Sequence, residues 1–203
     1  MLQGNMAEAR FYRIKDEVRI LGVDDGPFSR TDRDVIIVGT VFRGGTVLDG
    51  ILTTKVRVDG LNSTKKLSEM VSKCKFKDLR VIMLDGLGFG GFNLLDIEEL
   101  NRKTGLPVIV VVRKSPDFGE IESALNNLPN KRKRMDYIRK AGTPMRVETR
   151  PGKFVYVQTK GISLEDAGKI VRLSSTRSNI PEPLRVAHLI ASGVTLGESR
   201  GNA

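Results

Sequence analysis

The chain has 203 residues, of which 39% are hydrophobic, and it contains no low-complexity tract, so the composition excludes an intrinsically disordered protein. The single cysteine, Cys74, excludes an internal disulfide, and no apolar run in the sequence has the length of a membrane span or the position of a secretory signal. The 34 Lys and Arg against 24 Asp and Glu give a formal net charge of +10, which favours a polyanionic partner such as DNA or RNA. Because many cytoplasmic proteins are merely basic, the charge alone does not decide for nucleic acid.

These properties predict one cytoplasmic α/β domain over residues 1–203 that does not enter a membrane. We expect residues 1–16 to be a tag or a flexible segment, and Met6 is a second candidate for the natural start. The sequence leaves the oligomeric state open.

Three β-branched runs open the predicted domain. They cover residues 17–23, 34–42 and 46–58 and are separated by turn residues, among which Gly44 and Gly45 are typical of a hairpin. The pattern predicts an antiparallel meander of three strands.

Helices and fully apolar strands then alternate. Ser63 or Thr64 begins a predicted helix, and the runs at 79–86 and 106–112 are apolar enough for strands buried on both faces, with a helix at 94–104 between them. Strand–helix–strand order implies parallel pairing through right-handed crossovers. The remaining pattern predicts helices at 117–127, 131–141, 163–173 and 183–192, and strands at 145–149 and 153–158.

This order is typical of a ribonuclease H-like fold: a mixed sheet of three antiparallel strands followed by parallel strands, flanked by helices. Other α/β folds remain open on element order alone.

Aspartates follow three of the predicted strands: Asp24, with Asp25 beside it, Asp59 and Asp85. If the first and fourth strands lie side by side and parallel, Asp24 and Asp85 reach a common ion at one edge of the sheet. Clustered carboxylates repel one another unless a cation lies between them, and Mg²⁺ or Mn²⁺ accepts such oxygen ligands. The alternative is that Asp-Gly after a strand is an ordinary turn.

The glycine-rich segment 86–91 formally matches the dinucleotide-binding pattern G-x-G-x-x-G. Asp85 directly before it would repel a pyrophosphate, and Arg113 stands where an acidic residue would hold a ribose. We interpret the segment as a loop whose backbone approaches the substrate at Gly86 and Gly88, with a plain turn as the alternative.

Several basic residues are candidates for contact with phosphate. Lys114 ends the fifth strand, and a dense basic run contains Arg132 and Arg134. A solvated helix face is the alternative for the run. His188, the only histidine, lies on a helix with an apolar face, where packing is the alternative to catalysis.

Together these segments resemble endonuclease V and, more closely, the archaeal endonuclease V-like family called endonuclease dU. The resemblance is carried by G-V-D ending at Asp24, L-D-G around Asp85, R-K-S around Lys114, and P-E-P-L-R-V-A-H ending at His188. The resemblance covers residues 18–192 and implies that Asp24 and Asp85 bind the metal. The sequence departs from endonuclease V at Asp59, where that enzyme has a glutamate, and it has no clear match to the Pro-Tyr-x-Pro wedge.

The resulting hypothesis is a Mg²⁺-dependent endonuclease that cuts DNA containing a deaminated base, deoxyuridine or deoxyinosine. Asp24, Asp85 and Asp59 would hold the metal, Lys114 would hold phosphate, and His188 would assist at the attacking water or the leaving group. Gly86, Gly88, Lys114, Arg132, Arg134 and Arg185 are the candidate nucleic-acid-binding residues. The alternatives are a catalytically weak nucleic-acid-binding protein of the same fold, a dinucleotide-binding protein and a phosphatase of small esters.

Overall fold

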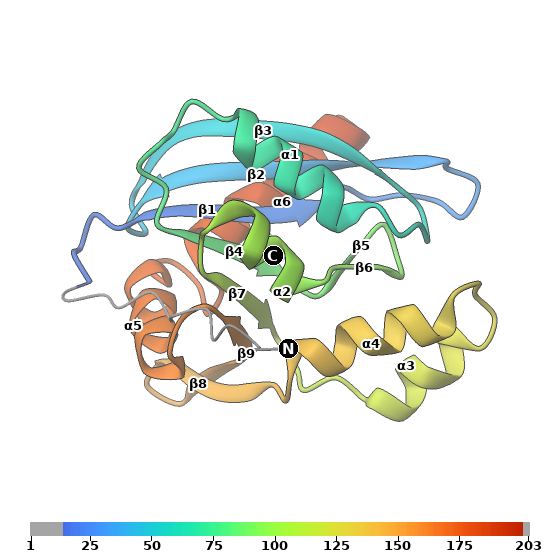
Figure 1. The fold of residues 1–203 in the computed structure, drawn as a ribbon. Coiled ribbons are helices and arrows are strands. Elements are labelled where there is room, and N and C mark those ends of the chain that lie inside the picture. Colours follow the sequence, from blue (N-terminus) through green and yellow to red (C-terminus); the bar gives the residue numbers. More distant parts are fainter. Residues whose placement is uncertain (1–13, 201–203) are drawn as a thin grey trace.

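The computed structural model describes residues 14–200, so most of the segment predicted to be a tag, and the candidate start Met6, lie outside the described residues. A seven-stranded sheet in the order β3-β2-β1-β4-β7-β9-β8 forms its centre (Figure 1). The strands are β1 (Arg19–Asp25), β2 (Asp34–Arg43), β3 (Val47–Arg57), β4 (Val81–Asp85), β5 (Gly88–Phe89), β6 (Asn93–Leu94), β7 (Val108–Val112), β8 (Met145–Arg150) and β9 (Lys153–Lys160). The helices are α1 (Ser63–Lys73), α2 (Ile97–Thr104), α3 (Phe118–Leu125), α4 (Lys131–Ala141), α5 (Leu164–Ser174) and α6 (Glu182–Leu196).

The pairing of the strands confirms the predicted mixed sheet. β1, β2 and β3 form the antiparallel meander, and β1, β4 and β7 are parallel neighbours. The sheet then ends in two antiparallel strands, β9 and β8. Only residues 151 and 152 join β8 to β9, and Gly152 has a φ of 70°. So short a connection makes a hairpin, because a parallel crossover needs a dozen residues or more.

The helix predicted at 94–104 begins later than expected. Residues 93 and 94 pair with 88 and 89 in a small hairpin, and α2 begins at Ile97. Asp96 caps this helix, since its side chain accepts a hydrogen bond from the backbone N–H of Glu99.

The two faces of the sheet carry different helices. The strand residues Leu21 and Val23 pack with α1 and α2, whereas their neighbour Ile20 packs with α5 and α6. Gly22, on the face of Ile20, lets α6 approach closely, because a Cβ at this position would lie 2.4 Å from the Cβ of Pro183. None of the helices in residues 14–200 combines the length and apolar character that a membrane crossing requires.

Candidate active site

Asp24 and Asp85 end two neighbouring parallel strands. Val23 is the register partner of Leu84, so the next residues of β1 and β4 are these two aspartates. Residues paired in register share a face of the sheet, and both aspartates line an open cavity of about 440 Å³. The structure therefore brings together the two carboxylates that the sequence placed at one sheet edge.

Asp24 is buried and bonded to the histidine of α6. Its Oδ1 accepts a hydrogen bond from the backbone N–H of Asp25, and its Oδ2 lies 2.9 Å from Nδ1 of His188. The residue is only 5% exposed. α6 runs along β1 from Pro183, which packs on Gly22, so His188 arrives beside Asp24 slightly more than one helical turn later.

The charges in this cavity affect one another. Burial raises the pKa of Asp24, and the Asp85 carboxylate adds to the rise, whereas the His188 hydrogen bond opposes it. The pKa of Asp85 is raised by burial and is held back by Arg113 and His188. The hydrogen bond to Asp24 raises the pKa of His188. Burial also raises the pKa of Asp25, which lines the same cavity, so the site holds three carboxylates that burial disfavours in their charged form.

Arg113 is a site residue that the sequence reasoning did not select. Its Nη1 and Nη2 each lie 3.3 Å from a carboxylate oxygen of Asp85. Strand alternation explains the position, because Val111 is the register partner of Asp85 and Arg113 follows it by two residues. Lys114, the next residue, is exposed and does not line the cavity. The structure does not bring Lys114 to the aspartates, and its contact with phosphate stays a prediction.

Asp59 lies beside the cavity instead of in it. It has a φ of 49°, its Oδ1 accepts from the backbone N–H of Phe92, and its own N–H donates to the carbonyl of Gly90. The N–H of Gly90 in turn donates to Oδ2 of Asp25, at 2.6 Å. These hydrogen bonds link Asp59 to Asp25, the neighbour of Asp24, and the role of Asp59 as a metal ligand stays a prediction.

Within residues 14–200, no three or more His, Cys, Asp or Glu side chains converge into a ready metal-binding cluster. Asp24 and Asp85 are the neighbouring carboxylates that would hold a divalent ion, and two such ligands would leave positions for water.

The glycine-rich segment does not form a dinucleotide-binding turn. Gly86 has a φ of 87°, and the chain then makes the β5–β6 hairpin before α2 begins at Ile97. A pyrophosphate site needs a helix N-terminus directly after the glycine-rich turn, so the dinucleotide-binding alternative is wrong. The approach of substrate to Gly86 and Gly88 stays a prediction.

An apolar cavity of about 230 Å³ lies beside this hairpin. Two of its wall residues are close in sequence to site residues. Leu87 follows Asp85 by two positions, and Val112 directly precedes Arg113. Its walls are formed by Leu87, Gly88, Gly91, Phe92, Leu94, Val112, Pro116, Phe118, Ile121, Ile138 and Gln158.

The structure corrects the prediction for Arg134. This residue is 1% exposed, and its guanidinium donates to the backbone carbonyls of Pro129, Asp59, Gly60 and Phe92. Its guanidinium is not available to phosphate, because these hydrogen bonds join α4 to the Asp59 turn and to the β5–β6 hairpin. The signal was present in the sequence, since the apolar Tyr137 and Ile138 follow at helical spacing and mark the buried face.

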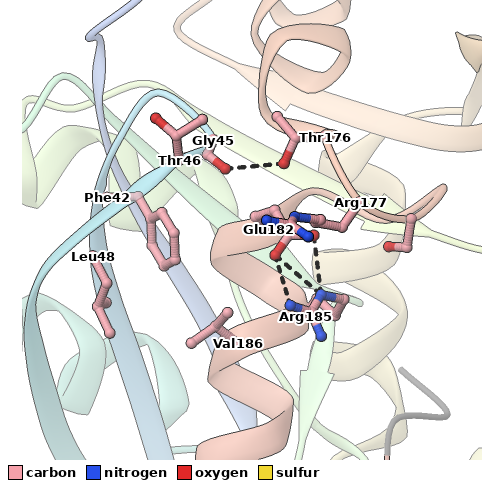
Figure 2. A pocket seen from close by; sticks show the side chains of 10 residues that line it. Phe42, Gly45, Thr46, Leu48, Thr176, Arg177, Glu182, Arg185 and Val186 are labelled. Carbon is pink, nitrogen blue, oxygen red and sulfur yellow. Dashed lines mark hydrogen bonds and ion pairs between the residues drawn. The ribbon is translucent and has the colours of Figure 1, made fainter.

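Arg132 and Arg185 lie away from the aspartates. Arg132 is exposed on α4. Arg185, near the start of α6, forms an ion pair of 2.8 Å with Glu182 and lines a separate cavity with Phe42 and Val186 (Figure 2). Their contacts with nucleic acid stay predictions.

Comparison with known proteins identifies the family. The model of the endonuclease dU family matches residues 16–195. The chain belongs to this family. A UPF0215 protein of Methanothermobacter thermautotrophicus is 57% identical over 202 residues, which cover 98% of both chains. A UPF0215 protein of Thermococcus gammatolerans is 46% identical over 92% of this chain and 97% of its own.

Solved structures agree with this assignment. The crystal structure of an Archaeoglobus fulgidus protein is similar with a TM-score of 0.78 and 41% identity, covering 87% of this chain and 97% of that one. Endonuclease V of Ciona intestinalis, solved with DNA containing an inosine, has a TM-score of 0.56 and 20% identity, covering 83% and 82%. The ribonuclease H-like fold and the resemblance to endonuclease V are therefore confirmed, and membership of the endonuclease dU family supports a nuclease in general.

Proposed function

We propose that the protein is a Mg²⁺- or Mn²⁺-dependent endonuclease that hydrolyses phosphodiester bonds in DNA containing a deaminated base. The observation that carries this proposal is the pair of Asp24 and Asp85, side by side at the ends of parallel strands, with Asp24 buried against His188. Membership of the endonuclease dU family supports the same chemistry and points to deoxyuridine.

The donor set fits a hard divalent cation. Burial and mutual repulsion disfavour the two charged carboxylates, and a cation between them removes both penalties. Mg²⁺ is commonly held by one or two carboxylates and keeps several waters. Asp24 and Asp85 would hold the ion, with Asp59 as the predicted further ligand. When bound, the ion supplies an activated water and neutralises charge on the leaving oxygen.

The protein's own groups have separate tasks around that ion. The bond from Asp24 to Nδ1 of His188 fixes the imidazole and leaves Nε2 as the ring nitrogen that can exchange a proton with substrate. The raised pKa of His188 favours its charged, proton-donating form. Arg113, which contacts Asp85 from the same face, is placed to hold a phosphate oxygen.

The apolar cavity beside the hairpin is the proposed place for the damaged base. An enzyme that recognises one base must remove it from the stack and enclose it between apolar or aromatic side chains. This cavity has such walls in Phe92 and Phe118 and a polar amide in Gln158, and its wall residue Val112 directly precedes Arg113 in the chain.

Metal-dependent cleavage of labelled oligonucleotides tests this function. Duplexes carrying uracil, hypoxanthine, an abasic site or no damage are incubated with Mg²⁺ or Mn²⁺ and the wild type, Asp85→Asn, or the exposed control Asp16→Asn. We expect cleavage beside a deaminated base by the wild type and by Asp16→Asn only. Salt-dependent binding without any product would favour the nucleic-acid-binding alternative, and equal cleavage by Asp85→Asn would refute the site.

A further inference from the structure

A second concave surface lies at the β3 edge of the sheet, beyond the Asp59 turn. This basic groove has a volume of about 650 Å³. It is lined by Arg33, Asp34, Lys55, Arg57, Gly60, Leu61, Asn62 and Lys66. We propose that the basic groove binds the phosphodiester backbone of the nucleic acid on one flank of the cut site. The inference rests on the proposed function, because it extends that substrate beyond the aspartates.

The charges of the groove match a polyanion. Four cationic side chains line it against one carboxylate, Asp34, whose closest oxygen is 3.9 Å from Arg33. Lys55, Arg57 and Lys66 form no ion pair with any acidic side chain within residues 14–200. Clustered cations in a concave surface repel one another, and phosphates relieve this repulsion while releasing their own counterions.

Three other lysines of the molecule differ in this respect. Lys103 is paired with Glu99, Lys160 with Glu98, and Lys169 with Glu165, at 2.6 to 2.8 Å. Figure 2 shows the same neutralisation in the cavity near the start of α6, where Glu182 takes up the charge of Arg185. The basic groove thus differs from these sites, where an acidic side chain already neutralises the cation.

The sheet register places the groove beside the proposed catalytic centre. Asp24 is paired with Val38 and Val38 with Thr53, so these residues share one face. Lys55 and Arg57 follow Thr53 on the same face, toward the end of the sheet at which Asp24 lies. Two strand spacings separate β3 from β1, which is about 10 Å across the sheet.

Hydrogen bonds join the groove directly to the active site. Gly60 lines the groove and follows Asp59, whose N–H donates to the carbonyl of Gly90. The N–H of Gly90 donates to Asp25, the neighbour of Asp24. The Asp59 turn therefore links the groove to the residue beside Asp24.

The walls of the groove are fixed by a buried asparagine. Nδ2 of Asn93, which is fully buried, donates to the carbonyl of Arg57 and to Oδ1 of Asn62, and its Oδ1 accepts from the N–H of Ser63. These bonds hold the end of β3 against the start of α1. A groove that is already formed loses little entropy when it binds.

Charge removal in matched sets tests the groove. The triple variant Lys55→Gln, Arg57→Gln, Lys66→Gln is compared with Lys73→Gln, Lys75→Gln, Lys77→Gln, which removes three exposed charges that do not line the groove. Binding of a fluorescent duplex is measured over a series of salt concentrations in the Asp85→Asn background, where no substrate is cut. We expect the groove variant to lose about 2 to 3 from the slope of log K against log salt, and the control set to lose less than about 1.

The outcomes separate the groove from the catalytic proposal. Equal slopes for the two triple variants, with the wild type cutting damaged DNA, would overturn the groove and leave the proposed function. A wild type that binds DNA through the groove but never cuts would overturn the proposed function and leave the groove. Polyglutamate binding as tightly as DNA, and losing its affinity in the groove variant, would overturn the assignment to nucleic acid in favour of an acidic protein.

Discussion

Two buried carboxylates of the α6 face make an instructive comparison, because Asp24 and Glu182 are each 5% exposed. Glu182 is neutralised by Arg185 through three hydrogen bonds of 2.8 to 3.1 Å (Figure 2). Asp24 instead shares its cavity with a second carboxylate, Asp85, and burial raises the pKa of both. Burial of an acid therefore does not identify a metal site. The cavity of Asp24 differs because it gathers three carboxylates, Asp24, Asp25 and Asp85, with Arg113 and His188.

The largest expected effect is on cleavage when either Asp24 or Asp85 is changed. Asp85→Asn should reduce the cleavage rate by about 10³-fold or more, because an electrostatic partner of the transition state is lost. Its melting temperature should not fall, since the change removes a repelling charge from beside Asp24. Rates with excess enzyme and thermal unfolding are the two measurements.

Glu182→Gln is the matched change in the neutralised pair. It should lower the free energy of unfolding by about 1–3 kcal/mol, because Arg185 loses its charged partner in a partly buried setting. The cleavage rate of the folded protein should stay close to that of the wild type. If Glu182→Gln lost cleavage but kept its stability, Glu182 would have a role in cleavage like that of Asp24 and not a structural one.

Substitution of His188 should have the next largest effect on cleavage. His188→Gln should lower the cleavage rate by about 10²-fold while Mn²⁺ binding persists, because the imidazole supplies a proton and not a ligand. The pH dependence of the rate should also change shape, since a titrating group has been removed. A variant that keeps the wild-type profile would show that His188 only packs against Asp24.

Two arginines of the basic run on α4 should separate stability from binding. Arg134→Met should cost about 2–4 kcal/mol of unfolding free energy, because four partly buried backbone carbonyls lose their donor. Arg132→Met should leave stability unchanged and lower the salt slope of DNA binding by about 1 if Arg132 contacts phosphate as predicted. Denaturant unfolding and salt-dependent binding of both variants provide the test, and an Arg134 variant with normal stability would contradict its assigned place.

The smallest effect is a pH dependence of stability without divalent ions. Burial raises the pKa of Asp25 from 3.8 to about 6. The folded state therefore binds a proton more tightly than the unfolded state, so this stabilisation is complete below pH 3.8 and is lost as the pH rises through about 6. At pH 8, Asp25→Asn should be more stable than the wild type by on the order of 1 kcal/mol, after allowance for partial exposure. Chemical unfolding at pH 4 and pH 8 should show a gain only at the higher pH.

Much of this arrangement was predictable from the sequence. The apolar runs indicated the strands, and an aspartate at the end of each of two adjacent parallel strands was enough to place Asp24 beside Asp85. The lone histidine reached Asp24 because Gly22 lets α6 pack directly on β1, a close approach that the sequence does not state.

Side-chain direction at strand ends was harder to predict. Lys114 was favoured over Arg113 by resemblance, although alternation from Val111 places Arg113 on the face of the aspartates. Asp59 does not line the cavity, because a positive φ and the N–H of Phe92 fix its carboxylate toward the hairpin. Local patterns locate such residues along the chain, but tertiary hydrogen bonds decide where their charged atoms lie.

Anomalous scattering from a crystal soaked in Mn²⁺ tests the central claim most directly. We expect a single strong peak that contacts a carboxylate oxygen of both Asp24 and Asp85, and no peak at Glu182 in the same crystal. A cavity without a peak, in which Arg113 still pairs with Asp85 at saturating Mn²⁺, would contradict the metal site and the nuclease mechanism built on it.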